Sequence, residues 1–331
     1  MKTVIFNDFG RQFKTEIRDS NRPTPAPGET LVRVHAAAMN RLSKLILEAD
    51  VPSAEGLTIL GNEGTGIVES GGKFAPGTPV IIYGGRELGV STDGIFQEWV
   101  TVRDSHLFKL PDNITLSQGA ALPVSAVTAY QAITSVSGLA SGDRVLITGA
   151  GGAVGFALMQ IARAFGFRPI GIVSSAAKAQ ALNERGFDDV ICGDGKGLTE
   201  ALSDILNDKS GVSAIFDPVG GPASGGLVPL LNHGGELVII GFVAGQSTGV
   251  GLADLVVAER HIRGYSLHAE SDEAVQKVFP EIAALVESGQ LIPVIDSEYA
   301  PEEIEAGYRR LDDRTLFGSV LLRFNTGTDE A

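Results

Sequence analysis

Cysteine is almost absent from this chain of 331 residues, and histidine is scarce. The single cysteine, Cys192, excludes an intramolecular disulfide framework and a structural zinc site built from cysteines. We expect it to end a buried strand, where it would be a core residue. The five histidines are scattered and none belongs to an H-E-x-x-H or Cys/His cluster, so no histidine-bound catalytic metal is predicted.

Long apolar runs and an excess of positive charge are missing as well. No run approaches the roughly 18 residues of a membrane-spanning helix, and the start, Met1–Phe6, meets Asp8 too soon for a secretory signal peptide. The net charge of −14 disfavours nucleic acid and anionic membranes as main partners. No G-x-S-x-G elbow of a serine hydrolase is present. We therefore expect a cytoplasmic protein without a nucleic-acid or membrane partner, whose chemistry comes from a bound cofactor.

The most informative segment present is 145–155, which reads V-L-I-T-G-A-G-G-A-V-G. A short apolar run ends in glycines and opens into a helical pattern, which predicts a strand, a tight turn and a helix. Such a turn presents backbone N–H groups at the positive end of a helix, where a pyrophosphate can bind. Gly149, Gly152 and Gly155 are three apart, which departs from the G-x-G-x-x-G spacing. A dinucleotide-binding turn and an ordinary strand-to-helix turn are both compatible with this segment.

The pattern of predicted secondary structure changes near residue 120. Up to about residue 120, short strands between Gly and Pro residues predict an antiparallel, barrel-like domain, with strands at 32–37, 64–70, 79–83 and 96–102. A helical segment, 117–136, then begins a strict alternation that predicts a doubly wound parallel sheet. Its strands are expected at 144–148, 169–173, 189–192, 214–217, 236–241 and 262–267. A long helix over 271–288 follows, then strands of the first domain at 292–295 and 319–322, and a frayed tail at 325–331.

The end of the second strand of that sheet, 171–178, bears on the choice between NADPH and NADH. NAD-binding folds carry an Asp or Glu there, which accepts hydrogen bonds from the ribose. This segment has no carboxylate but has Ser174, Ser175 and Lys178, which suit a 2′-phosphate. The sequence therefore favours NADPH. The alternative is that Ser174 or Ser175 caps the next helix and Lys178 is a solvated charge, but capping and phosphate binding can coexist.

Six segments, in order along the whole chain, resemble one family. They are 32–40 (V-R-V-H-A-A-A-M-N), 60–66 (L-G-N-E-G-T-G), 122–130 (L-P-V-S-A-V-T-A-Y), 142–147 (G-D-R-V-L-I) with the glycine turn, 216–221 (F-D-P-V-G-G) and 235–242 (G-E-L-V-I-I-G-F). The chain resembles the medium-chain dehydrogenase/reductase superfamily, specifically its zinc-free quinone oxidoreductase (zeta-crystallin-like) branch. That branch spaces its turn as A/G-x-x-G-x-x-G, in agreement with the spacing found here.

The resemblance implies an α/β fold with two domains. A Rossmann doubly wound parallel sheet, the NADPH-binding domain over 123–267, would be inserted in a GroES-like antiparallel β-barrel catalytic domain over 1–122 and 268–331. It also implies a homodimer, in which 262–267 would be an edge strand paired with its symmetry mate. Zinc alcohol dehydrogenases carry Cys at the position of Asn40 and His at that of Asn62, so no metal is implied here. Without a Lewis acid, hydride delivery to a quinone or an activated C=C is favoured over alcohol oxidation.

The resemblance also assigns site residues by position. Asn40 and Tyr130 are the candidate catalytic residues, and both would border the cofactor together with Thr128. The pyrophosphate would be held by Ala150, Gly151, Gly152, Ala153 and Val154, and the adenosine phosphate by Ser174, Ser175 and Lys178. The nicotinamide pocket would be lined by Phe242, Val243 and Leu267, and Arg314 would contact the cofactor. Thr128, Tyr130 and Phe242 could instead be ordinary packing residues.

Three positions depart from the family's patterns. Related enoyl thioester reductases place a proton-donating Tyr where this chain has Val51. A common Asp is replaced by Ser43, and a common Tyr by Gly193. Because Val51 replaces the proton-donating Tyr, Tyr83 or Lys44 would have to donate the proton if this chain were an enoyl reductase.

The sequence thus predicts an NADPH-dependent reductase that transfers a hydride directly to quinones or related α,β-unsaturated carbonyls, without a metal. Water or a nearby hydroxyl would supply the proton. An enoyl-CoA or enoyl-ACP reductase is one alternative, which the acidic composition disfavours. A non-catalytic NADPH-binding structural or regulatory protein is another, because fold and cofactor do not fix activity.

Overall fold

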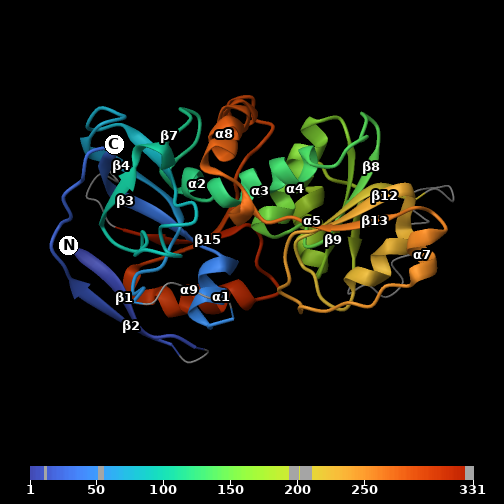
Figure 1. The fold of residues 1–331 in the computed structure, drawn as a ribbon, viewed down its shortest axis with the longest axis horizontal. Helices are drawn as coiled ribbons and strands as arrows, with labels where there is room; N and C mark the ends of the chain where they lie inside the picture. Colours follow the sequence, from blue (N-terminus) through green and yellow to red (C-terminus); the bar gives the residue numbers. More distant parts are fainter. Residues whose placement is uncertain (11–12, 51–55, 194–200, 202–210, 325–331) are drawn as a thin grey trace. The chain divides into compact units, whose positions relative to one another are not determined.

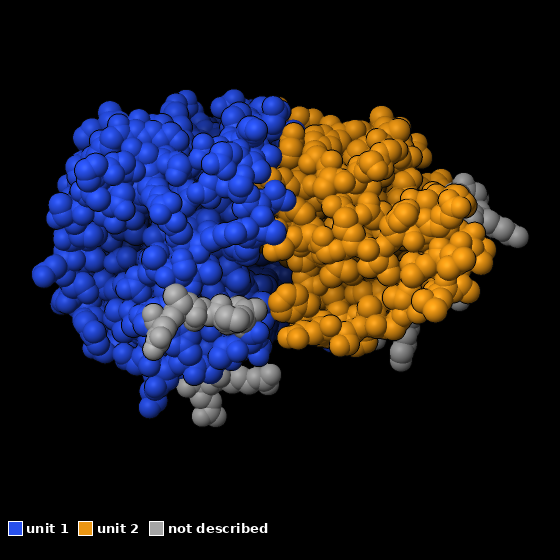
Figure 2. Space-filling view, in the orientation of Figure 1, with its two compact units in different colours: residues 1–124, 268–287, 292–331 blue, residues 125–267, 288–291 orange. Residues whose placement is uncertain are grey.

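The structure is a computed structural model that describes residues 1–10, 13–50, 56–193, 201 and 211–324. Val51 and the predicted tail 325–331 lie outside the described residues. The chain forms two compact units (Figure 2). Unit 1 comprises Met1–Val124, His268–Glu287 and Ile292–Ala331, and unit 2 comprises Ser125–Leu267 and Ser288–Leu291. In the sequence, unit 2 is therefore an insertion within unit 1.

Unit 2 contains a six-stranded sheet in the order β10-β9-β8-β11-β12-β13. Strands β8, β9, β12 and β13 of this sheet are labelled in Figure 1. Every neighbouring pair of strands in it is parallel. The strands are β8 (Arg144–Ile147), β9 (Arg168–Val173), β10 (Val190–Cys192), β11 (Val212–Asp217), β12 (Leu231–Ile239) and β13 (His261–Gly264). Counted along the chain, this order is 3-2-1-4-5-6, the order of doubly wound dinucleotide-binding sheets. The six strands predicted from the sequence are confirmed.

These strands are short, continuous apolar runs, as expected for a parallel sheet that is covered on both faces. Leu146, Ile170, Ile215 and Leu237 are buried at its centre. The helical segments are α3 (Pro123–Thr134), which lies mostly in unit 2, α4 (Ala153–Ala164), α5 (Ala176–Asn183), the 3-10 helix η2 (Ser224–Leu230) and α7 (Leu252–Val256). Because the strands are parallel, their carboxyl ends meet at one edge, where ligands bind in such sheets.

Unit 1 contains a seven-stranded sheet whose main path runs β14-β15-β3-β4-β5-β7, with β6 paired to β3. The strands are β3 (Glu29–Met39), β4 (Glu63–Gly71), β5 (Pro79–Tyr83), β6 (Trp99–Arg103), β7 (Leu107–Lys109), β14 (Ile295–Tyr299) and β15 (Ser319–Arg323). All pairs are antiparallel except β14 with β15, which is parallel. Pairing among the described residues follows an open path, so closure into a barrel stays a prediction.

A hairpin and several helices complete unit 1. They are β1 (Lys2–Asp8) paired with β2 (Lys14–Asp19), then α1 (Arg41–Leu47), α2 (Leu116–Ala120), α8 (Asp272–Glu287) and α9 (Ile304–Asp312). The long helix predicted over 271–288 is confirmed by α8. Phe6, Phe96 and Tyr308 are buried in the main core of this unit. No helix in the described part of the chain has both the length and the apolar character needed to cross a membrane.

Four details of the sequence prediction are wrong. The helical run 117–136 is two helices, because Pro123 begins α3 and cannot continue α2. The strand expected at 292–295 begins only at Ile295, because Pro293 has no N–H for a ladder hydrogen bond. Leu267 lies in a 3-10 turn rather than in the last strand, which ends at Gly264. Cys192 is exposed, because side chains alternate along β10 and Ile191 is the residue that packs inward.

Candidate functional site

The turn between β8 and α4, which we call the glycine turn (residues 149–155), has a backbone that only glycine allows at two positions. Gly149 has a φ of +58°, in the left-handed region. A Cβ on Gly155 would lie 2.1 Å from the carbonyl oxygen of Gly149, so the start of α4 packs directly on the turn. A Cβ on Gly152 would meet the same oxygen at 3.4 Å, an ordinary contact. Sterics therefore account for Gly149 and Gly155 but not for Gly152.

The N-terminus of α4 offers backbone donors at this turn. Gly152 is the N-cap and supplies no side-chain oxygen to the N–H groups of the first helical turn. Within the predicted pyrophosphate cradle, the N–H of Ala150 donates to the carbonyl of Ile172 and that of Gly152 to the carbonyl of Gly149. The donors left for an anion are thus those of Gly151 and of the first residues of α4. A partial positive charge at the helix N-terminus favours an anion there.

Ser174, Ser175 and Lys178 lie together at the next strand end, after β9. Ser175 is the N-cap of α5, and its hydroxyl accepts a hydrogen bond from the backbone N–H of Lys178 at 3.4 Å. The Lys178 ammonium donates to the Ser174 hydroxyl at 3.5 Å. The capping role considered for the serines is therefore confirmed for Ser175. It leaves the exposed Ser174 hydroxyl and the ammonium of Lys178 side by side.

Other predicted residues of unit 2 lie in three places. Thr128 is buried on α3, whereas Tyr130 is half-buried there with its ring edge against Phe165. Phe242 and Val243 follow β12 at the carboxyl edge of the sheet, and both are exposed. Leu267 is buried. Exposure separates Phe242 and Val243 from ordinary core residues, because large apolar side chains are usually covered.

Asn40 in unit 1 is half-buried and forms a cluster with the buried Asn62 and Glu63, which we call the Asn40 cluster. As the N-cap of α1, Asn40 accepts a hydrogen bond from the backbone N–H of Ser43 on its Oδ1, at 3.0 Å. Its Nδ2 donates to Asn62 Oδ1 and to Glu63 Oε1, both at 2.8 Å. Both N–H groups of the amide are therefore used within the protein. The donor left over in the cluster is the buried Nδ2 of Asn62, which has no hydrogen-bond partner.

Glu63 is the functional candidate that sequence reasoning missed. Burial raises the pKa of its carboxyl from 4.5 to about 7, against hydrogen bonds from Asn40 and the backbone N–H of Val124 that lower it. A single charged residue in the glycine-rich segment 60–66 is the signal that the sequence offers. A group that titrates near neutral pH next to Asn40 marks this cluster as a candidate site.

The two proton donors considered for an enoyl reductase differ in their surroundings. The ammonium of Lys44 pairs with Glu48 at 3.5 Å and with Asp312, so it is already engaged. Tyr83 is buried, and burial raises the pKa of its phenol above the ordinary value. The phenol therefore keeps its proton at neutral pH.

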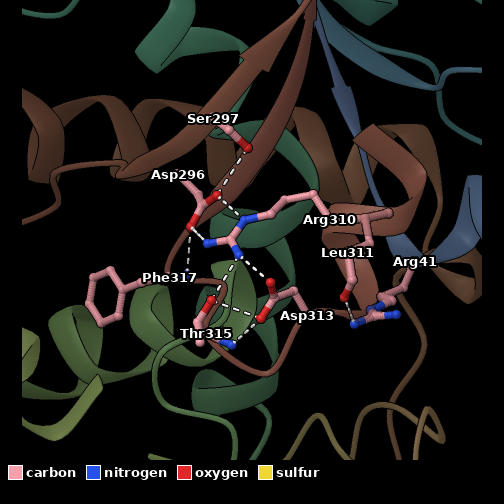
Figure 3. Close-up of polar contacts among 8 residues, drawn as sticks. All are labelled: Arg41, Asp296, Ser297, Arg310, Leu311, Asp313, Thr315 and Phe317. Atoms are coloured by element: carbon pink, nitrogen blue, oxygen red, sulfur yellow. Dashed lines mark hydrogen bonds and ion pairs between the residues drawn. The ribbon is translucent and has the colours of Figure 1, made fainter. Parts of the chain in front are cut away.

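Arg314 lies on a turn after α9. Its neighbours in sequence, Asp313 and Thr315, take part in a network around the ion pair of Arg310 and Asp296 (Figure 3). Arg310 donates from Nε and Nη2 to the two carboxylate oxygens of Asp296, each at 2.7 Å. Its Nη1 donates to the hydroxyl of Thr315 at 2.8 Å, and Asp296 accepts from the backbone N–H of Phe317 at 3.0 Å. This network fixes both ends of the turn on which Arg314 is exposed. In the described part of the chain, no group of three or more His, Cys, Asp or Glu side chains could hold a metal ion.

Comparison with known proteins gives a consistent picture. Residues 26–112 match the alcohol dehydrogenase GroES-like domain, and residues 153–287 match the zinc-binding dehydrogenase family. Human quinone oxidoreductase is 26% identical over 94% of both chains. Acryloyl-coenzyme A reductase of Sulfurisphaera tokodaii is 30% identical over 98% of this chain and 100% of its own. The crystal structure of an NAD-dependent alcohol dehydrogenase, 26% identical, superimposes with a TM-score of 0.88 over 98% of this chain and 100% of its own.

Gly155→Ala tests the glycine turn. The added Cβ would overlap the Gly149 carbonyl, so we expect the free energy of unfolding to fall by about 2 kcal/mol or more. Urea denaturation followed by circular dichroism measures it. Gly226→Ala is the control, because a Cβ there meets nothing within 4 Å. Equal stability of the two variants would contradict the turn described here.

Glu63→Gln tests the buried carboxyl. Because its pKa is raised from 4.5 to about 7, its contribution to stability is full below pH 4.5 and is lost as the pH rises through 7. Gln does not titrate, so the stability of the variant relative to the wild type should increase by about 3 kcal/mol over that range. Urea titrations at several pH values, with the exposed Glu273→Gln as control, measure this difference. A difference independent of pH would show that Glu63 titrates normally.

Proposed function

Because the chain belongs to the medium-chain dehydrogenase/reductase superfamily and to its quinone oxidoreductase branch, we propose that it is an NADPH-dependent reductase of quinones or related α,β-unsaturated carbonyls. The observation that carries this proposal is the similarity to quinone oxidoreductases along 94% of the chain. The family implies a nicotinamide cofactor and an oxidoreductase activity. In this assignment, 123–267 is the NADPH-binding domain, and 1–122 with 268–331 is the catalytic domain.

The residues of the glycine turn fit a dinucleotide. The backbone N–H groups of the cradle Ala150–Val154 that remain open would bind the pyrophosphate, close to a backbone that leaves no room for a Cβ at Gly155. At the strand end after β9, Ser174, Ser175 and Lys178 would bind the 2′-phosphate of NADPH. No carboxylate lies between 171 and 178 to repel it. A solved relative is NAD-dependent by its title, so the preference for NADPH rests on these side chains alone.

The remaining predicted residues would surround the nicotinamide, which supplies a hydride when bound. Thr128, Phe242, Val243 and Leu267 are proposed to border it, and Tyr130 and Arg314 are proposed to contact the cofactor. Asn40 would act through the second lone pair of its Oδ1, because both of its N–H groups are held by Asn62 and Glu63. The substrate takes the hydride and one proton, so a quinone becomes a hydroquinone. We assign the proton to water, because Lys44 is held in ion pairs.

Reduction of an enoyl thioester is the second candidate. Acryloyl-coenzyme A reductase of Sulfurisphaera tokodaii is 30% identical over 98% of this chain, which favours it. The net charge of −14 opposes it, because coenzyme A carries several phosphates. An enolate formed from a thioester also needs more stabilisation than a reduced quinone does.

Turnover assays separate the two candidates and test the cofactor. We expect the purified protein to oxidise NADPH with 1,4-benzoquinone, measured by the loss of nicotinamide absorbance, faster than with crotonyl-CoA.

Lys178→Met should weaken NADPH binding roughly 10-fold and leave NADH binding unchanged, because only NADPH has the 2′-phosphate. The exposed Lys277→Met of α8 is the control. Turnover of crotonyl-CoA alone would support the enoyl reductase. An equal loss of affinity for NADPH and NADH in Lys178→Met would overturn the role of Lys178.

A homodimer is part of the proposal. β13 is the last strand of the six-stranded sheet, so one side of it has no neighbour among the described strands. Close to it in sequence, Leu252, Val256 and Val257 of the α7 region are 75–82% exposed, and Ile262 on β13 itself is 40% exposed. A free strand edge and exposed apolar side chains both favour association, and a second copy of the chain would cover them.

Val256→Glu combined with Ile262→Lys tests this interface. Charges on the exposed apolar residues should convert a dimer into a monomer, because burying them without partners is unfavourable. Analytical ultracentrifugation at micromolar protein measures the mass. Ile292→Lys, at an exposed apolar position of unit 1, should leave the dimer intact. A monomeric wild type, or a double variant that remains dimeric, would contradict the proposed interface.

A further inference from the structure

We propose that Asp217 is a positioning residue that supports both cofactor-binding segments of unit 2 at once, the glycine turn and the segment 241–244. This inference rests on the proposed function for what those segments bind. Asp217 is the last residue of β11, is 1% exposed, and was not among the predicted site residues.

The carboxylate of Asp217 is surrounded by hydrogen-bond donors. Its Oδ1 accepts from the hydroxyl of Thr148 and from the backbone N–H groups of Val219 and Gly220, the latter two at 3.0 Å. Its Oδ2 accepts from the hydroxyl of Ser224 at 2.6 Å. A buried carboxylate is an acceptor only, so donors on both oxygens offset the unfavourable loss of its hydration. These contacts fold residues 217–224 around one side chain.

The first segment supported in this way is the glycine turn. Thr148 directly precedes Gly149, and its backbone N–H donates to the carbonyl of Phe216 at 3.1 Å. A Cβ on Gly149 would lie 2.8 Å from a methyl carbon of Val219, so the Val219 side chain packs directly against the glycine turn. Asp217 therefore holds the glycine turn twice, through the hydroxyl of Thr148 and through the backbone N–H of Val219.

The second segment is 241–244, which carries Phe242 and Val243. The carbonyl of Asp217 accepts from the N–H groups of Ile240 at 2.9 Å and Gly241 at 3.3 Å, and the carbonyl of Val219 accepts from Ala244 at 3.0 Å. A Cβ on Gly220 would lie 2.3 Å from the carbonyl oxygen of Gly241, so the two backbones are in direct contact. The turn that Asp217 folds is thus packed against this segment as well.

One side chain therefore fixes the turn assigned to the pyrophosphate and the segment assigned to the nicotinamide. Val219 packs against the glycine turn and Gly220 against the segment 241–244. Loss of the carboxylate should therefore loosen both segments together. Asn can replace it, because an amide oxygen accepts from Thr148, Val219 and Gly220 while its NH₂ donates to the Ser224 hydroxyl, which can also accept. Ala cannot replace it, because it leaves four donors, three of them buried, without their acceptor.

The first experiment compares Asp217→Ala, Asp217→Asn and the exposed control Asp188→Ala by fluorescence titration with NADPH and with NADH. We expect Asp217→Ala to raise the Kd of both cofactors roughly 10-fold or more, with the ratio of the two unchanged. This separates Asp217 from Lys178, which acts on NADPH alone. Asp217→Asn should stay within about threefold of the wild type. An unchanged Kd for folded Asp217→Ala, or a loss confined to one cofactor, would overturn the proposal.

The second experiment uses hydrogen exchange on the free protein, so it does not depend on cofactor binding. In Asp217→Ala, exchange should become faster in 149–155 and 241–244 together, and Asp217→Asn should restore both. Faster exchange in one segment only, or equally across unit 2, would overturn the shared support. Should Asp217→Ala fail to fold, Thr148→Val removes one donor and should show the same paired pattern at smaller size. A wild type that binds neither NADPH nor NADH would refute the proposed function, while the exchange pattern would still test the role of Asp217.

Discussion

Unit 2 depends on backbone segments that approach one another so closely at the carboxyl edge of its sheet that no Cβ fits between them. Gly155 packs against the carbonyl oxygen of Gly149. In the same way, Gly220 packs against the carbonyl oxygen of Gly241, and Gly241 packs against that of Pro218. These contacts bring the starts of helices and turns onto the strand ends, where first-turn N–H groups can face a ligand. A sheet of the same strands with ordinary loops would bury the same core but would hold its ligand edge less rigidly.

Much of this arrangement could be predicted, because it is encoded locally. The six parallel strands are continuous apolar runs, and the glycine turn is one contiguous segment, so both were recognisable in the sequence. What the sequence did not reveal depends on partners far along the chain. Asp217 can be placed at the end of its strand, on the edge of the glycine turn, but the sequence does not show that Thr148 donates to it. Glu63 is of a type usually found on the surface, and only the fold shows that it is buried against Asn40 and Val124. Cys192 was misplaced for the same reason, since the face of β10 that is covered follows from packing and not from the strand pattern.

The buried carboxyl groups of Asp217 and Glu63 have different hydrogen-bond partners, which suit them to different roles. Asp217 has donors on both oxygens from four different residues, and these contacts fix the position of its side chain. Glu63 accepts from Asn40 and Val124 among the described residues, and burial raises its pKa to about 7. The first is a rigid support, whereas the second can change its protonation state near neutral pH beside a candidate catalytic residue. The unpartnered Nδ2 of Asn62, which is unfavourable by about 1–3 kcal/mol, keeps this second cluster from being fully satisfied.

These polar contacts also bear on the choice of substrate. Asn40 has no N–H left to donate, Lys44 is held by Glu48 and Asp312, and the phenol of Tyr83 is a weaker acid than usual because it is buried. None of these three groups is arranged as a strong proton donor. A quinone is electrophilic enough to accept a hydride with little acid assistance, whereas an enone or enoyl thioester develops an enolate that must be stabilised. The surroundings of Asn40, Lys44 and Tyr83 therefore agree with the proposed quinone substrate, and Glu63, with a pKa of about 7, is the acid in the Asn40 cluster that an enoyl reductase would have to use instead.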